Sequence, residues 1–228
     1  MQAMSEATPK PPPKPTPKPT PKSIRQPRRR YSSPLRAAQA DRTRAQVLAA
    51  AATCFEESGW AGTTVAAIAE RAGVAVETIY SAFGSKKAVL RQVIDVAVVG
   101  DSEPVPLAER EVFTRLGEGA RDARIDAGIE MLTDIHGRLA KVWRTVGEAA
   151  ASDPEIDGWR VHWDEGRRVD TRRSIELILG EPVDDVTLDL LWGILSHEFY
   201  GMLVFDRGLD RGQYVERVHE AVIRLVAR

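Results

Sequence analysis

The stretch Thr63–Lys86, TTVAAIAERAGVAVETIYSAFGSK, decides the fold of this chain. In its first half Ile68 and Ala72 stand four positions apart, which places both apolar side chains on one face of a helix. Gly73 follows directly, and glycine tolerates the left-handed backbone of a tight turn. A second helical segment over 76–83 completes a predicted helix-turn-helix, a motif whose second helix turns polar side chains towards a DNA groove.

Helical patterns flank this motif on both sides. The preceding helix is expected to begin at Ser33-Pro34 or nearer Asp41, and Gly59 is a plausible end for it. Thr63 or Thr64 can cap the first short helix. Ser85 is expected to cap a further helix that reaches about Val99. The β-branched run 93–99 alone favours a strand. A helix is expected there nevertheless, because no partner strand is visible elsewhere in the sequence. The apolar face of the preceding helix consists of Val47, Leu48, Ala51, Ala52 and Phe55, with Cys54 beside it as a core residue.

The chain divides into three regions. Residues 103–106, Glu-Pro-Val-Pro, interrupt the helical pattern and place a domain boundary near 102. We therefore expect a tail over 1–32, a helix-turn-helix domain over 33–102 and a helical domain over 103–228. The fold class is all-α. The helices expected in the last region cover about 107–117, 121–151, 155–179, 184–206 and 211–227.

The N-terminal region is rich in lysine and proline and has the largest net positive charge of the chain. Residues 1–30 hold eight Lys and Arg against Glu6 alone, whereas 101–228 have a net charge of −9. A polyanion would be attracted to the first region and repelled by the last. The tail is interpreted as either a solubilising linker or a basic arm on DNA, and the sequence leaves both open.

Other classes of protein find little support. No apolar stretch is long enough to span a bilayer, and no apolar run follows Met1 as a secretory signal would require. The single cysteine cannot form an internal disulfide, so a cytoplasmic location is expected. The histidines lack metal-ligand spacing, and Gly117-Glu118-Gly119 lacks the third glycine of a dinucleotide-binding loop. We therefore expect no catalytic residues, no metal and no cofactor.

The sequence resembles the TetR family of one-component bacterial repressors. The similarity is specific across about Arg42–Leu90 and looser over 189–214. It implies an N-terminal three-helix DNA-binding domain and a C-terminal helical bundle that binds an effector and forms a homodimer. The segments that carry the resemblance are Thr63–Val74, Thr78–Tyr80 and Phe83–Lys86, with Ala50–Ala52 and Phe55 before them.

The resemblance also implies roles for matching positions. Thr64 would bind a phosphate through its hydroxyl and backbone N–H, and Tyr80 would place its phenol on another. Lys86 would bind a phosphate with help from the dipole of its helix. Three of the side chains at these positions also have a purely structural interpretation. Tyr80 could be a packed aromatic residue, Lys86 a solvated charge, and Glu77 an acid that stabilises its helix. The positions expected to face base edges are Val76, Glu77 and Thr78.

One position departs from the family pattern. Many relatives carry serine or threonine where this chain has Ala75, and alanine is a poor helix cap that costs about 1 kcal/mol. A phosphate contact from that side chain is lost as well. The hypothesis that follows is that the basic tail supplies the missing affinity for DNA.

Two apolar stripes near the C-terminus repeat every three or four residues, and a two-fold partner could bury them as a four-helix bundle. The family forms its dimer there, and the alternative is an intramolecular core. The expected interface residues are Leu188, Leu191, Trp192, Leu195, Phe199, Val215, Val218 and Val222.

Bulky aromatic residues and a methionine in the intervening helices can line an apolar pocket with a few polar anchors. In the family such a pocket binds an effector that separates the two DNA-reading heads. Nothing in the sequence selects the ligand. The expected lining residues are Met131, His136, Trp143, Trp159 and Trp163.

These observations predict a sequence-specific transcriptional regulator, released as a repressor from a pseudo-palindromic DNA operator by a small-molecule effector. The alternative is a nucleoid-type protein that binds DNA through the basic tail without sequence preference. An enzyme with an incidental helix-turn-helix is a third possibility, which the motifs above do not favour.

Overall fold

The computed structural model describes residues 34–101, 103 and 105–227, and every regular element in these ranges is helical. The expected all-α fold is confirmed, whereas the expected tail over 1–32 lies outside the described residues. In chain order the elements are α1 (Pro34–Gly62), α2 (Val65–Ala72), α3 (Val76–Phe83), α4 (Lys86–Val99), η1 (Leu107–Glu109), α5 (Glu111–Thr114), η2 (Arg115–Gly117), α6 (Arg121–Ala150), α7 (Pro154–Leu179), α8 (Asp185–Ile194), α9 (His197–Gly201), η3 (Met202–Asp206) and α10 (Arg211–Val226).

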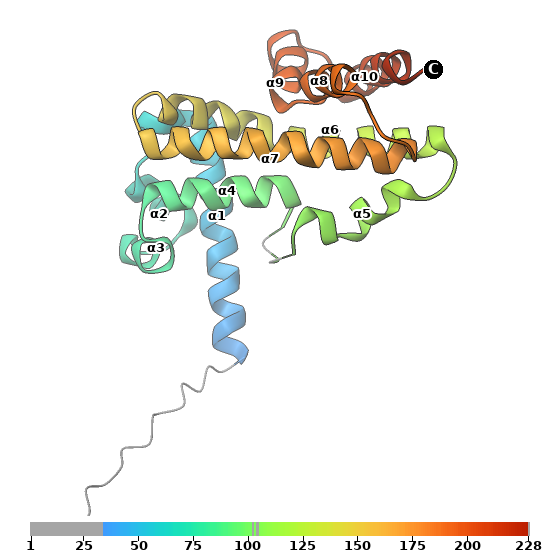
Figure 1. Ribbon diagram of the computed structural model, residues 1–228. Helices are drawn as coiled ribbons and strands as arrows, with labels where there is room; N and C mark the ends of the chain where they lie inside the picture. Colours follow the sequence, from blue (N-terminus) through green and yellow to red (C-terminus); the bar gives the residue numbers. More distant parts are fainter. Residues whose placement is uncertain (1–33, 102, 104, 228) are drawn as a thin grey trace, which may run out of the picture.

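Two long helices, α6 and α7, lie side by side through the centre of the molecule (Figure 1). Helix α4 packs along α6, and α1, α2 and α3 gather at one end of this pair. Helices α8, α9 and α10 lie on the opposite side of the α6–α7 layer from α4 (Figure 1). The N-terminal half of α1 projects away from the rest, and its described side chains from Arg36 to Arg42 are all exposed.

The first hydrophobic core joins the helix-turn-helix to the central pair of helices. Its buried residues come from α1, α2, α3 and α4, but also from α6, where Val142 and Val146 are each 1% exposed. Ile156 of α7 is completely buried in the same cluster. The core therefore continues across the boundary that the sequence places near 102, and the motif does not have a core of its own.

Helix α1 bends sharply at Gly59, the residue at which the sequence predicts its end. The backbone there has φ 63° and ψ −170°, a conformation that strains any residue with a Cβ atom. The bend frees backbone groups, and α6 binds them. Thr145 donates its hydroxyl to the carbonyl of Phe55 at 3.0 Å, and Glu148 accepts the N–H of Trp60 at 2.9 Å.

The single helix expected over 184–206 is wrong, because the structure divides that segment into α8, α9 and the π-helical turn η3. Leu195 leaves the helical conformation at φ −94° and ψ 39°. Ser196 then caps α9 by accepting the N–H of Phe199 at 3.0 Å. The helix expected over 107–117 is likewise a chain of three short turns, whereas α6, α7 and α10 match the expected ranges closely.

Candidate nucleic-acid interface and internal cavity

The start of α2 is fixed by two adjacent threonines with different tasks. Thr63 is buried and donates its hydroxyl to the carbonyl of Cys54 at 2.9 Å. Thr64 is exposed, and its Oγ1 caps α2 by accepting the N–H of Ala67 at 3.0 Å. Of the two threonines, Thr64 is thus the cap and the side chain that faces solvent.

The turn between α2 and α3 depends on Gly73. Its φ of 66° and ψ of 33° lie in the left-handed region, and its N–H bonds to the carbonyls of Ala69 and Glu70. The N–H of Val74 also reaches Ala69 O, at 3.0 Å. These bonds close the end of α2 and set the angle at which α3 departs.

Helix α3 has a buried inner side and an open outer side. Ile79 is completely buried and Phe83 is 8% exposed, which anchors the helix to the first core. On the outer side Glu77 is exposed and Tyr80 is 52% exposed, so neither side chain is a packed core residue. Val76 and Thr78 are half-buried at the start of the helix.

The two ends of α3 are held differently. Ala75 occupies the N-cap position and makes no side-chain hydrogen bond there, as its methyl group dictates. At the other end the guanidinium of Arg44 on α1 donates to Ala82 O at 3.4 Å and lies 4.8 Å from the centre of the Phe83 ring. Arg44 was not singled out from the sequence, since its contact depends on how α1 crosses α3.

Lys86 sits in the first turn of α4, as expected, but its ammonium group faces the protein. Its Nζ donates to the carbonyls of Trp60 at 2.7 Å and Thr63 at 2.8 Å, and it lies 3.9 Å from the centre of the Trp60 ring. Partial burial lowers the pKa of this ammonium. Two of its three hydrogens are therefore occupied, and it joins the end of α1 to the start of α4.

An internal cavity of about 420 Å3 lies between α4, α6 and α7, a size typical of small-molecule sites. Four of the expected lining residues, Met131, His136, Trp143 and Trp163, do line it. Trp159 does not: it packs against the first core, with the guanidinium of Arg91 5.7 Å from its ring centre.

The cavity also has polar lining residues that sequence reasoning missed, among them Arg167 on α7 and His197 at the start of α9. The rings of His136 and His197 lie 6.2 Å apart, centre to centre, and both side chains are 3% exposed. Burial, with the neighbouring His197 and Arg167, lowers the pKa of His136 to about 3, so this imidazole is neutral near pH 7. Burial also lowers the pKa of Arg167. No local pattern distinguishes Arg167, because its helix-face neighbours Asp164, Asp170 and Thr171 are polar too.

The expected dimer residues fall into two groups. Leu188, Leu191, Val218 and Val222 are buried in a second core within the subunit, together with Tyr200 and Tyr214, so they offer no surface to a partner. The apolar faces of α8 and α10 pack against each other, and α10 also packs against α6. Trp192, Leu195, Phe199 and Val215 are half-buried. The apolar side chains that remain exposed nearby are Val186 at 72%, Leu190 at 51% and Met202 at 51%.

No group of three or more His, Cys, Asp or Glu side chains is placed to hold a metal ion within 34–101, 103 and 105–227. None of the helices that the structure describes is both long and apolar enough to cross a bilayer.

Comparison with known proteins bears on both halves of the chain. The family model of bacterial regulatory proteins, tetR family, matches residues 47–93. No curated protein matches the sequence. Among solved structures, a protein assigned to the TetR-family transcriptional regulators of Mesorhizobium loti MAFF303099 has a TM-score of 0.58 at 18% identity, covering 83% of this chain and 97% of its own.

Two further structures show the same arrangement of helices. A transcriptional regulator of Aquifex aeolicus VF5 has a TM-score of 0.58 at 16% identity, over 80% of this chain and 99% of its own. A TetR-like transcriptional regulator of Rhodococcus sp. RHA1 has a TM-score of 0.54 at 16% identity, over 82% and 97%. The helix-turn-helix segment 47–93 thus matches the tetR family model of bacterial regulatory proteins, and the chain has the fold of solved TetR-family transcriptional regulators.

Proposed function

We propose that this protein is a homodimeric transcriptional regulator that binds a pseudo-palindromic operator on cytoplasmic DNA and is released from it by a small molecule. Residues 33–102 read DNA, and 103–228 bind the effector and form the dimer. The observation that carries the proposal is the open outer side of α3, with Glu77 and Tyr80 in solvent opposite the buried Ile79. An open polar side on a short, anchored helix is what major-groove recognition requires.

The proposed contacts divide into two kinds. Thr64 and Tyr80 bind phosphates on either side of the groove, and the third hydrogen of the Lys86 ammonium binds another. These contacts set the position of the protein on the duplex and act alike on all sequences. The residues proposed to read bases are Val76, Glu77 and Thr78.

A single α3 can read only a few base pairs, so sequence specificity is served by two copies. Met202 of η3 is 51% exposed. The exposed apolar side chains of α8, Val186 and Leu190, lie four residues apart on one face of that helix. We propose that a second subunit covers these side chains across a two-fold axis, which would fix the separation of the two α3 helices.

Release by an effector is supported by the way α6 serves both functions. The same helix lines the cavity at His136 and Trp143 and is tied to the motif by side-chain hydrogen bonds. Thr145 and Glu148 hold the bend in α1, and Arg138 donates from Nε to Ala97 O at the end of α4, at 2.9 Å. A ligand that shifts α6 therefore shifts α1 and α4 with it. If the ligand prefers a spacing that DNA does not fit, the operator is released and the protein acts as a repressor.

Selection of bound sequences from random double-stranded DNA, with the purified full chain, tests this proposal. The expected result is a pair of inverted half-sites about one helical turn apart. Glu77→Ala should then change the preferred bases within each half-site, whereas Glu70→Ala, an exposed acid on α2, should leave them unchanged. Recovery of unrelated sequences with uniform protection would instead favour a nucleoid-type protein.

A further inference from the structure

The lining of the cavity is elongated. Its residues on α6 run from Ile125 to Trp143, eighteen residues apart, or about 27 Å along a helix. On α7 they run from Trp163 to Leu179, about 24 Å. An elongated lining of this kind suits a ligand with an extended chain.

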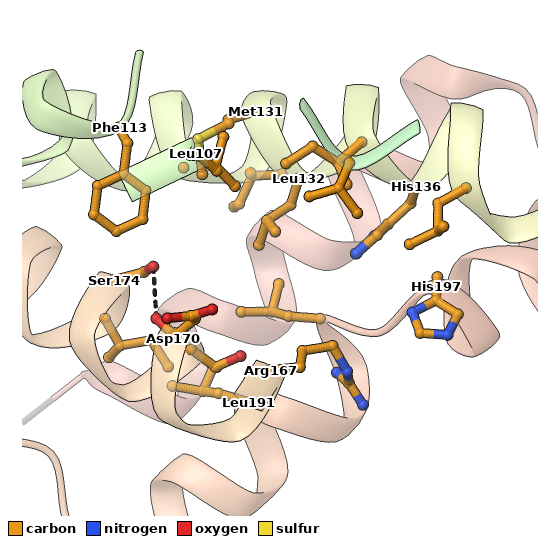
Figure 2. A pocket seen from close by; sticks show the side chains of 18 of the residues that line it. Leu107, Phe113, Met131, Leu132, His136, Arg167, Asp170, Ser174, Leu191 and His197 are labelled. Atoms are coloured by element: carbon orange, nitrogen blue, oxygen red, sulfur yellow. Dashed lines mark hydrogen bonds between the residues drawn. The ribbon is translucent and has the colours of Figure 1, made fainter. Parts of the chain in front are cut away.

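The two halves of the cavity differ in chemistry. One half is lined mainly by apolar side chains, among them Leu107, Phe113 and Met131, with Asp170 and Ser174 of α7 on the same side of the view in Figure 2. His136, His197 and Arg167 gather at the other side. A ligand that matches both halves has an apolar body and a single polar head.

The polar half contains buried nitrogen atoms that need a partner. Nδ1 of His136, Nδ1 of His197 and Nε of Arg167 are all buried without a hydrogen-bond partner among the described residues. A buried donor left in this state costs free energy that an acceptor oxygen would recover. The Nε–H of Arg167 is always a donor, and a neutral imidazole can place its one proton on Nδ1.

The carboxylates of the lining are turned to other partners or to solvent. Asp95 and Asp170 are exposed. Asp164 lies 3.5 Å from a guanidinium nitrogen of Arg160 and 3.9 Å from Arg167 Nε, beyond hydrogen-bond distance of the latter. Arg167, whose side chain is 20% exposed, is thus the cation of the polar half, and its guanidinium lies 4.2 Å from the centre of the Trp192 ring. Near this cation an anionic head is favoured over a cationic one.

His197 lies next to an acid. Its Nε2 is 2.9 Å from the carboxylate of Glu198, a group that is 51% exposed. The contact does not have hydrogen-bond geometry, so Nε2 is buried without a hydrogen-bond partner, as Nδ1 is.

We propose that the cavity binds an unbranched aliphatic carboxylate, with its chain between α6 and α7 and its head on Arg167 Nε and His136 Nδ1. This inference rests on the proposed role of the cavity as the effector site. The volume accommodates roughly fourteen non-hydrogen atoms if each takes about the 30 Å3 of a water molecule. Dodecanoate has that size and is the probe chosen.

Calorimetric titration of the full chain with dodecanoate, dodecan-1-ol and dodecylamine, below micelle-forming concentrations and without DNA, tests the head group. Dodecanoate should bind at least tenfold more tightly than the alcohol and more tightly still than the amine. Across octanoate, decanoate and dodecanoate the affinity should rise about fourfold per CH2 group. Equal or tighter binding of the amine, or no dependence on chain length, would overturn the inference.

Two substitutions locate the head. Arg167→Met should weaken dodecanoate binding by about 10- to 100-fold and leave dodecan-1-ol within about threefold. Arg168→Met is the matched control, because Arg168 pairs with Asp189 at 2.6 Å and does not line the cavity, so it should change neither affinity. Equal losses for acid and alcohol in Arg167→Met would contradict a contact with the head.

A third substitution tests the apolar half and does not depend on Arg167. Ile129 is a buried lining residue that lies two helical turns from His136. Its replacement by the larger phenylalanine should shorten the cavity. Ile129→Phe should weaken dodecanoate more than octanoate. If dodecanoate binds as described but does not release the selected operator, the inferred ligand is supported and the proposed release mechanism is contradicted. If the protein binds its operator but none of the three carboxylates, the inferred ligand is contradicted and the proposed DNA-binding function is not.

Discussion

The hydroxyl of Thr145, near the C-terminal end of α6, donates to the main-chain oxygen of Phe55, in α1, at 3.0 Å inside the first core. The carbonyl of Phe55 lies four residues before Gly59, where the backbone leaves the helical conformation. A side chain of the cavity-lining helix is therefore bonded to the main chain just before the bend in the helix that supports the DNA-reading motif.

Thr145→Val keeps the shape of this side chain and removes the donor. The carbonyl of Phe55 then loses this buried hydrogen bond, so the free energy of unfolding should fall by about 1 kcal/mol. Urea denaturation measures the change. Thr53→Val is the control, since Thr53 donates to Ala49 O within its own helix, and it should change stability by about 0.5 kcal/mol or less. Equal losses of stability in the two variants would contradict a specific contribution of the hydrogen bond from Thr145 to Phe55.

Lys86→Met should have two separate effects. Loss of the charge-assisted bonds to Trp60 O and Thr63 O should lower the free energy of unfolding by about 1.5–3 kcal/mol. Loss of the proposed phosphate contact should reduce the slope of log K against log salt by about 0.9. Lys87→Met is the neighbouring control: Lys87 pairs with Asp153 and Glu155, and its loss should leave the slope unchanged. An unaltered slope in Lys86→Met would restrict Lys86 to its structural role.

Tyr80→Phe should weaken DNA binding by roughly tenfold on the selected operator and on scrambled duplexes alike, because a phosphate contact carries no sequence information. Its ring is 52% exposed, so stability should stay within about 0.5 kcal/mol of the parent. Fluorescence anisotropy with labelled duplexes gives both affinities. Tyr214→Phe, a change in the second core, should not alter DNA affinity. A shift of sequence preference in Tyr80→Phe would speak against the phosphate role.

Ala75→Ser should stabilise the protein by about 1 kcal/mol, because a serine hydroxyl at the N-cap of α3 can accept a backbone N–H that has no side-chain partner in the structure. Thermal and urea unfolding report the gain. Ala82→Ser, an exposed substitution inside the same helix, should give no gain because serine is a poorer helix former than alanine there. A loss of stability in Ala75→Ser would show that α3 begins elsewhere.

Acid sensitivity should depend on His136. Its pKa is lowered to about 3 in the folded protein from an ordinary value of 6.5, so the unfolded chain binds a proton that the folded chain excludes. Stability should therefore fall as the pH drops from 6.5 towards 3, by up to about 1.4 kcal/mol per pH unit from this group. His136→Gln should flatten the profile over this range. The exposed His162→Gln should leave it as in the parent, and the same flattening there would refute the assignment.

The sequence was sufficient where short-range signals decide the structure. Gly73 marks the turn, Gly59 marks the bend in α1, and Ala75 falls at the N-cap as expected. The β-branched run 93–99 forms the end of α4, because its apolar side chains pack on α6 and no strand is available to pair with it. In that segment tertiary packing overrode intrinsic propensity.

The sequence was insufficient where long-range packing decides which side of a helix is covered. Trp159 was expected in the cavity, but it lies a turn from Trp163 on α7 and packs against the first core instead. Arg167 and His197 line the cavity because α7 and α9 both pack on α6, a relationship that no local pattern records. The break at Leu195 was missed for a related reason, since apolar periodicity continues across it.

The core that the helix-turn-helix shares with α6 and α7 limits how the protein can be truncated. Ending the chain after Gly100 would remove the side chains that now cover Val47, Phe55 and Val89. The isolated motif would then expose an apolar surface and would not be an independently stable DNA-binding domain. A chimaera that transplants this motif onto a foreign body would have to carry the α6 segment 139–149 along with it, because that segment is part of the motif's foundation.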